Sequence, residues 1–292
     1  MTEINLDISD KSKSDYRKLA INFYSKIKAN GDRVTLETIK SKLLELADHH
    51  TRNYWRRLRG AIVFDQFEKG YDGPAYTIKA LQNTSTNPAP KQQRNRKITP
   101  KDYQRLFNKS SKRLQNILSI AQITGARSSE FKNIIPLDDD KFFILGAKKT
   151  DTRGDDRIIQ LNRIEAWRLK IALNDFHADL QTTTLKDYLG SVRKELAKTS
   201  RSIWPRRKPT TYSTFRHQMG SNLKANESMN DKDKSKILGH RSTKSIESYG
   251  NKTNGTGGHS IEAGECSDNV KDNKTNFGDI GLNLNADDFR MS

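Results

Sequence analysis

The chain has 292 residues, of which 33% are hydrophobic and 30% are charged, so it is long enough for one large or two modest domains. Its formal net charge of +18 favours a polyanionic partner, because each phosphate that a cationic protein neutralises releases condensed counterions; solubility alone is the other interpretation. No apolar run approaches the ~20 residues that span a bilayer, and the single Cys266 excludes an internal disulfide. Residues 1–7 lack the features of a secretory signal, so we expect a cytoplasmic protein with no membrane partner.

Three amphipathic helices are predicted at the N-terminus, because apolar residues recur at helical spacing over 14–30, 35–47 and 50–66. The third helix carries basic side chains along one of its faces, at Arg52, Arg56, Arg57 and Arg59. An ordinary solvated face explains this pattern equally well. We expect residues 1–82 to form a helical DNA-binding domain, with Arg52, Arg56 and Arg57 as candidate groove contacts.

Residues 83–97 have the composition of a flexible linker. The first half contains Pro88 and Pro90, and the second half is basic, with Arg94 and Arg96 among its cations. A basic linker is suited to lie along a DNA backbone. Thr99 and Pro100 then supply an N-cap and a proline at the first helical position, which predicts the start of a second domain.

The second domain, residues 98–250, is predicted to be mainly helical with a small antiparallel sheet. Two short strand-like runs, 141–145 and 157–161, are joined by a polar turn with Gly154. Asn162 and Ser242 are candidate N-caps, the second for a short helix that carries Tyr249. The other predicted helices are 100–108, 111–123, 184–198, 210–225 and 231–239. The whole chain is therefore expected to be α+β, mainly α.

The C-terminal stretch 251–292 differs in composition from the rest. It has four Lys and Arg residues against seven acids, which leaves a formal +21 on the first 250 residues. It is rich in Asn, Gly, Asp and Ser and has few large apolar residues, so we expect it to be largely disordered.

Four segments of the second domain carry residues suited to phosphoryl chemistry. Arg127 precedes Glu130 by three residues in the segment Thr-Gly-Ala-Arg-Ser-Ser-Glu, and Arg216 occurs in Phe-Arg-His. His240 ends Leu-Gly-His, and Tyr249 follows it by nine residues. Guanidinium groups match the non-bridging oxygens of a phosphodiester, and a phenol is able to attack phosphorus. Each residue alone is more often a surface or core residue; the order and spacing of the four together favour a joint site.

This order and spacing resemble the catalytic domain of tyrosine recombinases, the phage integrase family of site-specific DNA recombinases. The resemblance covers residues 98–250 by motif and residues 10–80 by architecture. It implies that Arg127 and Arg216 hold the scissile phosphate, that His240 bonds to the phosphate or the attacking oxygen, and that Tyr249 is the nucleophile. Glu130 is implied as a supporting acid.

Two positions leave questions open. The family usually has histidine three residues before the second arginine, where this chain has Ser213, a hydroxyl without the imidazole charge. The family also has a lysine in the turn after the second strand, where it protonates the leaving 5′-oxygen. Either Lys148 or Lys149 fits, and we favour Lys149. A nucleotide-binding loop ending in this turn is excluded, because Lys141 stands where the first glycine is required.

The implied function is cleavage and rejoining of DNA through a 3′-phosphotyrosine, at a site on a mobile element or chromosome. It requires neither ATP nor metal, and we expect no cofactor. Implied partners are double-stranded DNA and three further copies of the chain, in a homotetramer on two DNA sites with exchange of a C-terminal segment. The alternatives are a catalytically weak or inactive DNA-binding protein on the same fold, which Ser213 favours, and a type IB topoisomerase-like enzyme.

Overall fold

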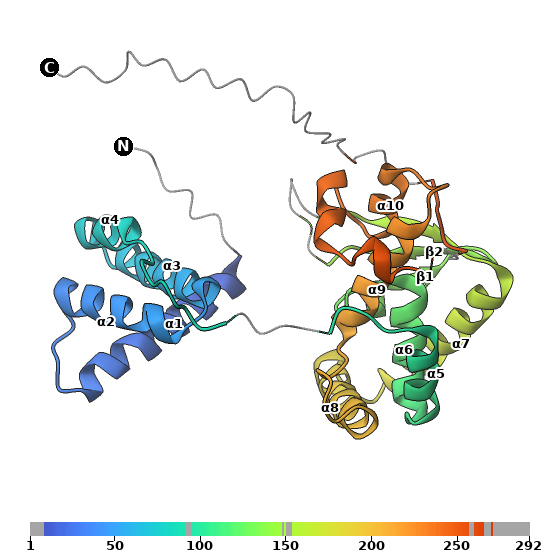
Figure 1. Ribbon diagram of the computed structural model, residues 1–292, viewed down its shortest axis with the longest axis horizontal. Coiled ribbons are helices and arrows are strands. Elements are labelled where there is room, and N and C mark those ends of the chain that lie inside the picture. The colour runs from blue at the N-terminus through green and yellow to red at the C-terminus, as the bar shows by residue number, and fades with distance from the viewer. Residues whose placement is uncertain are drawn as a thin grey trace, which may run out of the picture. The chain divides into compact units, whose positions relative to one another are not determined.

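The computed structural model describes residues 9–90, 95–147, 149, 154–256, 260–265 and 270. Its contacts divide the chain into two compact units, residues 1–92 and 93–292, shown in Figure 1. Each unit has its own hydrophobic core. We describe the two units separately.

The first unit is a set of packed helices. Their bounds are α1 Asp10–Ala29, α2 Leu36–His49, α3 Arg52–Glu68 and α4 Asp72–Ala80. The hydroxyls of Thr35 and Thr51 cap α2 and α3, accepting backbone N–H bonds from the first turn. Helix α3 packs against α1, α2 and α4. Its Leu58 and Ile62 are buried against α1 and α2, and each buried side chain of this size contributes roughly 1.5–3 kcal/mol.

Helix α4 was not anticipated from the sequence. Its first turn contains Gly73 and Pro74, a pair that ordinarily signals a loop. The first four N–H groups of a helix have no partner within it, so proline costs no hydrogen bond there. Ala75 and Ile78 then bury the helix against its neighbours.

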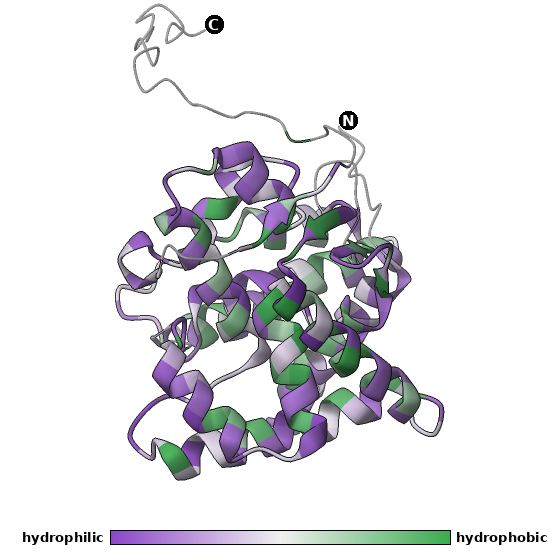
Figure 2. Ribbon diagram, turned by 90° about the vertical axis from the view of Figure 1, so that its right-hand side faces the viewer, coloured by the Kyte–Doolittle hydropathy of each residue, from purple (hydrophilic) through white to green (hydrophobic). Residues whose placement is uncertain are grey.

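The second unit contains the remaining elements. They are α5 Pro100–Asn108, α6 Lys112–Thr124, η1 Phe131–Asn133, β1 Ile134–Pro136, β2 Lys141–Ile144, β3 Arg157–Gln160, α7 Arg163–Asp179, α8 Leu185–Ile203, α9 Tyr212–Ala225, α10 Asp231–Ile237, η2 Thr243–Ser248, η3 Lys252–Asn254 and β4 Glu262–Ala263. Helix α6 contacts α5, α7, α8 and α9 and is buried along most of its length. Figure 2 shows helices in which hydrophilic and hydrophobic residues are interspersed, as expected where helices bury one face.

The sheet is antiparallel, with strand order β1-β2-β3-β4. Phe142 pairs with Ile159 in the centre, and both side chains are fully buried. Sequence periodicity predicted β2 and β3 but missed β1 and β4, which have three and two residues and are too short to show alternation. The expectation of a mainly α fold with a small antiparallel sheet is confirmed.

Strand β4 lies in the stretch 251–292, where the sequence indicated disorder. Ile159 and Gln160 of β3 pair with Ala263 and Glu262, and Ile261 is fully buried. Residues 257–259, 266–269 and 271–292 of that stretch lie outside the described part of the chain.

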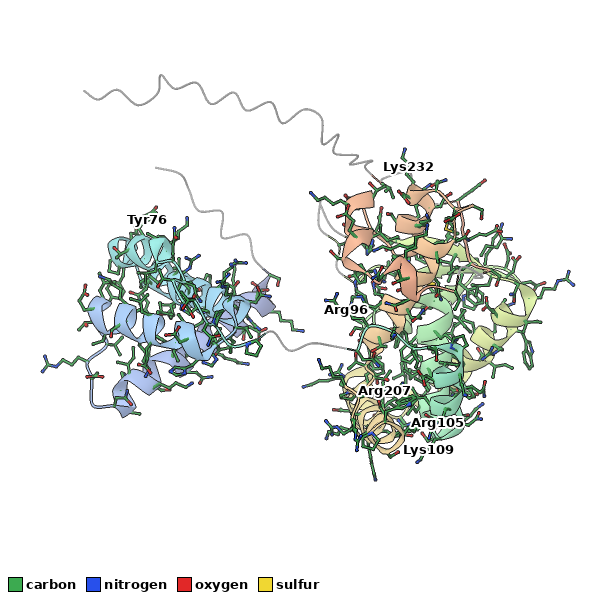
Figure 3. The ribbon with its side chains drawn as sticks, in the orientation of Figure 1. Tyr76, Arg96, Arg105, Lys109, Arg207 and Lys232 are labelled. Carbon is green, nitrogen blue, oxygen red and sulfur yellow. The ribbon has the colours of Figure 1, made fainter. Side chains whose placement is uncertain are left out.

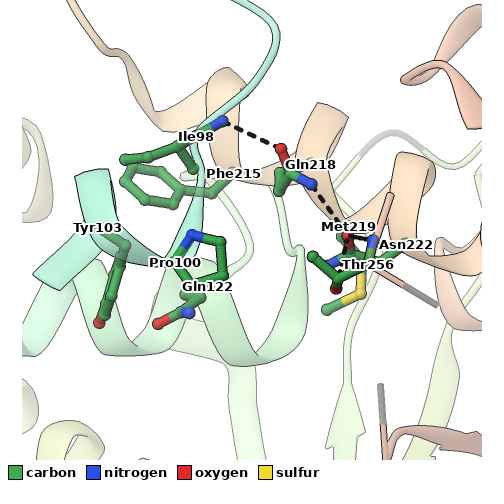
Figure 4. Close-up of a pocket in the computed structure, with 9 residues that line it drawn as sticks. All are labelled: Ile98, Pro100, Tyr103, Gln122, Phe215, Gln218, Met219, Asn222 and Thr256. Atoms are coloured by element: carbon green, nitrogen blue, oxygen red, sulfur yellow. Dashed lines mark hydrogen bonds between the residues drawn. The ribbon is translucent and has the colours of Figure 1, made fainter. Parts of the chain in front are cut away.

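Helix α9 joins the segments that enter and leave the second unit. The backbone N–H of Ile98 donates to Gln218, whose amide donates to the carbonyl of Asn254. The N–H of Thr256 donates to the side chain of Asn222. These contacts line a cavity of about 90 Å³, seen in Figure 4. The hydroxyl of Thr214 in α9 also donates to the carbonyl of Asn95, so the described end of the predicted linker is attached to α9, whereas Arg94 lies outside the described residues.

Candidate functional site

Arg127 lies in a turn that is built around Gly125 and Glu130. Helix α6 ends at Gly125, which has a φ of +58° and leaves no space for a side chain, because a Cβ there would approach Met219 within 2.7 Å. The backbone N–H of Arg127 donates to Oε2 of Glu130 at 2.9 Å, and its Nη1 donates to Oε1 at 2.7 Å. The carboxylate therefore fixes both ends of Arg127, whose side chain remains 20% exposed.

Arg216 is held from α9 by two backbone carbonyls. Its Nη1 donates to Gly125 at 2.9 Å, and its Nη2 donates to Leu238. The same Nη2 lies 3.1 Å from Nε2 of His240. Because a guanidinium has no acceptor, Nε2 accepts this bond, and the proton of a neutral His240 is on Nδ1. Nδ1 is buried without a hydrogen-bond partner.

Tyr249 follows η2 and faces these groups. Its ring centroid lies 4.8 Å from the Arg216 guanidinium carbon and 4.9 Å from the His240 ring. Helix α9 approaches it closely, since a Cβ added at Gly220 would lie 2.8 Å from the Tyr249 Cβ. The next residue, Gly250, has a φ of +64° and donates its N–H to Nδ1 of His217. Tyr249 and the residue after it are thus both in contact with the helix that carries Arg216.

The charges of the cluster shift the pKa values of its members. Burial alone would raise the pKa of Tyr249, but the nearby cations Arg216 and Arg127 outweigh it and lower that pKa below its ordinary value. Burial together with the charges of Arg216, Arg127 and Arg157 lowers the pKa of His240 to about 3. At neutral pH the site therefore contains a neutral imidazole beside a phenol whose ionisation is favoured.

No family model and no curated protein matches the chain. A XerH site-specific recombinase bound to its difH substrate in a pre-cleavage complex matches with a TM-score of 0.52 and 14% identity, over 81% of this chain and 75% of that one. A lambda integrase dimer bound to a COC′ core site matches with a TM-score of 0.50 and 17% identity, over 82% and 76% of the two chains.

A lambda integrase tetramer bound to a Holliday junction matches with a TM-score of 0.50 and 18% identity, over 81% and 79% of the two chains. The chain has the tyrosine recombinase fold. The likeness extends over most of both chains, although fewer than one residue in five is identical.

On this recombinase fold, the structure brings together Arg127, Glu130, Arg216, His240 and Tyr249. It does not bring two other predicted residues into that group by any described contact. The hydroxyl of Ser213 lies 2.9 Å from that of Thr211. Lys149, with its side chain 42% exposed, places its ammonium 2.7 Å from Asp156, and Lys148 lies outside the described residues.

The predicted DNA contacts of the first unit lie on the exposed side of α3. Arg52 and Arg56 are exposed, and Arg52 also reaches the carbonyl of Ser85 at 3.4 Å. Arg57 is exposed with its guanidinium 3.7 Å from Asp15. Arg59, the fourth basic residue of that helix, turns inward over the ring of Trp55. The exposed positions are available for a polyanion, and Arg59 has a structural role.

Sequence patterns missed two residues of the cluster. Arg157 is buried against Glu130, and its signal was a charged residue at an inward position of β3, on the same face as Ile159. His217 packs its ring 5.3 Å from the Tyr249 ring. Its position one residue after Arg216 indicated a different helix face, but the chain after Tyr249 returns across that face of α9.

No three His, Cys, Asp or Glu side chains of the described residues converge as a metal site would require. None of the described helices is both long and apolar enough to cross a membrane.

Proposed function

We propose that this chain is a site-specific DNA recombinase that breaks and rejoins strands through a 3′-phosphotyrosine on Tyr249. The proposal depends on one observation above all. The Tyr249 ring centroid lies 4.8 Å from the guanidinium carbon of Arg216. The charges of Arg216 and Arg127 lower the pKa of the Tyr249 phenol. Two cations beside a nucleophile form a site for a phosphodiester under attack.

The two arginines stabilise the charge that develops on the non-bridging oxygens of the phosphate. Glu130 and the carbonyls of Gly125 and Leu238 fix their guanidiniums before DNA arrives, so the site needs little reorganisation during the reaction. His240 is neutral at pH 7. It therefore adds no further charge to the site, and it bonds to a phosphate oxygen only through a ring nitrogen that carries a proton.

The chemistry is an exchange of phosphoesters. The phenolate oxygen of Tyr249 forms a bond to phosphorus after its proton has left to solvent, and the bond from phosphorus to the 5′-oxygen breaks. Lys149 or Lys148 supplies the proton that makes this oxygen a 5′-hydroxyl. The 5′-hydroxyl of a partner duplex then attacks the phosphotyrosine, and the phenol is regenerated, so that no external energy source is consumed.

Duplex DNA is the proposed substrate, from a mobile element or a chromosomal site. In the second unit, a groove of about 740 Å³ is lined by basic side chains of the linker and of the segment after α8, among them Arg96, Lys97, Arg206 and Arg207. Figure 3 labels Arg96 and Arg207 in this unit. Such groups attract a phosphate backbone. The XerH and lambda integrase structures with the same fold are DNA complexes, which supports the proposal.

Four protomers on two DNA sites, with exchange of a C-terminal segment, complete the proposal. The tetramer of lambda integrase on a Holliday junction supports this assembly. Sedimentation of the protein on pre-formed four-way junctions tests it, and a complex of two protomers alone would contradict it.

The decisive experiment is a trap for the covalent intermediate. The target site is first mapped on genomic DNA, and a duplex nicked beside the cleavage point then loses the short fragment that carries the 5′-hydroxyl. The wild-type chain is expected to accumulate an adduct, whereas Tyr249→Phe binds the same DNA without one. Binding without an adduct by the wild type would indicate an inactive DNA-binding protein. Relaxation of a plasmid that lacks the target site would indicate a topoisomerase.

A further inference from the structure

Arg157 is a buried cation that the proposed chemistry leaves without a role. It is the first residue of β3, and its side chain is 2% exposed, on the same strand face as Ile159. Burial of a charge is costly unless the charge is paired. Its Nη2 is paired, whereas its Nε and Nη1 are buried without a hydrogen-bond partner. An incompletely satisfied arginine at this depth requires an explanation.

The first contact of Arg157 leads to Arg127. Nη2 of Arg157 donates to Oε2 of Glu130 at 2.9 Å, and the same carboxylate receives the backbone N–H and the guanidinium of Arg127. Glu130 is 0% exposed. One carboxylate therefore joins an arginine at the proposed phosphate site to an arginine inside the protein.

The second contact of Arg157 leads to His240. A Cβ added at Gly239, where φ is +63°, would approach Nη1 of Arg157 within 2.8 Å. Arg157 thus packs against the turn whose neighbouring residues are Leu238, which accepts from Arg216, and His240. The carbonyl of Gly239 also accepts from the N–H of Asp155 at 3.3 Å, close to the start of the same strand.

The charge of Arg157 affects the pKa values of both Glu130 and His240. Burial would raise the pKa of Glu130, but the charge of Arg157, followed by the hydrogen bonds and charge of Arg127, lowers it to about 2. After burial, Arg216 and Arg127, Arg157 also contributes to the low pKa of His240. A carboxylate that stays ionised keeps its bonds to Arg127 over the whole working pH range.

We propose that Arg157 is a positioning residue for strand cleavage: through Glu130 it fixes the Arg127 guanidinium, and against Gly239 it supports the turn that presents His240. The inference rests on the proposed function, because its effect is expressed in the rate of phosphotyrosine formation. Arg157 itself does not touch the DNA.

Arg157→Met, which keeps the length of the side chain and removes its charge, is the principal test. The full-length variant is expected to form the adduct on the nicked duplex about 100-fold more slowly, because displacement of a reacting group by about 1 Å has an effect of this size. Its affinity for the uncut site is expected to change less than about twofold. Arg157→Lys should recover part of the rate. Arg163→Met, at an exposed arginine of α7, is the matched control.

A second measurement does not depend on cleavage. Carbon-13 NMR of the Glu130 carboxyl group, assigned with Glu130→Gln, should show a pKa that is higher in Arg157→Met than in the wild type. If the wild type forms no adduct, the proposed function fails, and this titration still tests the coupling of Arg157 to Glu130. An unchanged Glu130 pKa together with a rate like that of Arg163→Met overturns the inference.

If Arg157→Met does not fold, the test uses the double variant Arg157→Met/Glu130→Gln, in which both buried charges are removed together. Such a pair is often tolerated when its single members are not. The double variant is expected to cleave more slowly than Glu130→Gln alone by much less than about 100-fold, because the contact through Glu130 is already lost and only the support of the Gly239 turn remains to be removed. A further loss of about 100-fold or more relative to Glu130→Gln would mean that Arg157 acts independently of Glu130 and would contradict the inference.

Discussion

Gly220 and Tyr249 are in direct contact, because a Cβ placed on Gly220 would lie 2.8 Å from the Cβ of Tyr249 and 3.0 Å from its carbonyl oxygen. This glycine is in the interior of α9, four residues after Arg216. The absence of a side chain at position 220 therefore sets the distance between Tyr249, the proposed nucleophile, and the helix that carries Arg216, the proposed phosphate ligand.

Gly220→Ala is expected to slow adduct formation by at least about tenfold, since the new methyl group displaces the backbone of Tyr249. Gly190→Ala in α8 is the matched control. A Cβ at Gly190 meets nothing within 4 Å, so this change is expected to be neutral, or to stabilise α8 by roughly 0.5–1 kcal/mol. Single-turnover cleavage and thermal unfolding measure the two effects. Equal cleavage rates in the two variants would show that the contact does not position Tyr249.

Arg127→Ala is expected to lower the cleavage rate by about 10²–10³-fold, the usual loss when one oxyanion ligand is removed. The affinity for uncut DNA should change little, because this is one phosphate contact among many. Rate and affinity are measured on the same duplex, with Arg193→Ala at an exposed site of α8 as a control. Equal losses in rate and affinity would exclude the proposed role.

Lys149→Ala and Lys148→Ala separate the two candidate general acids. The lysine that protonates the 5′-oxygen is expected to become dispensable when that oxygen is replaced by sulfur, because a thiolate leaves without a proton. Lys149 at present pairs with Asp156, so we expect DNA to draw its ammonium away from that carboxylate. Cleavage of duplexes with and without the 5′-bridging sulfur is compared for both variants. A sulfur substrate that rescues neither would remove both lysines from this role.

The stability of the folded protein is expected to depend on the ionisation of Glu130 at acid pH. Its folded pKa of about 2 lies below the ordinary 4.5, so its stabilising effect is complete above about pH 4.5 and is lost as the pH falls toward 2. The effect is on the order of 3 kcal/mol. The difference in melting temperature between the wild type and Glu130→Gln should therefore shrink between pH 5 and pH 2. A difference that stays constant would mean that the ionised carboxylate gains nothing from its arginines.

Arg56→Ala tests the basic face of α3. Removal of one phosphate contact should weaken binding to all sequences alike and reduce the slope of log affinity against log salt by about one. Lys42→Ala serves as the control, because Lys42 is already 2.7 Å from Glu45 on α2. A loss confined to the target sequence would instead indicate that Arg56 reads a base.

Much of this architecture was accessible from the sequence because its determinants are local. The hydroxyl of Thr99 and the ring of Pro100 start α5 where the sequence indicated, and the alternation in β2 and β3 predicted the central strands. Strand β4 was not predictable in this way. Its two residues are held by pairing with a strand about a hundred positions earlier, and composition around them indicated disorder.

The candidate site likewise contains residues that local motifs predicted and one residue that they did not. Arg127, Arg216, His240 and Tyr249 were predicted from motif spacing, and the chain does bring their side chains together, although their roles remain proposals. Arg157 was not predictable, because the partner that makes its burial tolerable, Glu130, is 27 residues away and belongs to a different turn. Tertiary pairing of charges is not encoded in any local pattern.

On the proposed function, the bond from Gly250 to His217 decides which subunit's DNA Tyr249 attacks. Because this bond ties Tyr249 to the helix that carries Arg216 within one molecule, each subunit of the proposed assembly is expected to cleave the strand that its own arginines bind. A subunit that lacks Arg216 and a neighbour that lacks Tyr249 are therefore expected not to complement each other. Each cleavage event is expected to require one subunit in which both residues are intact.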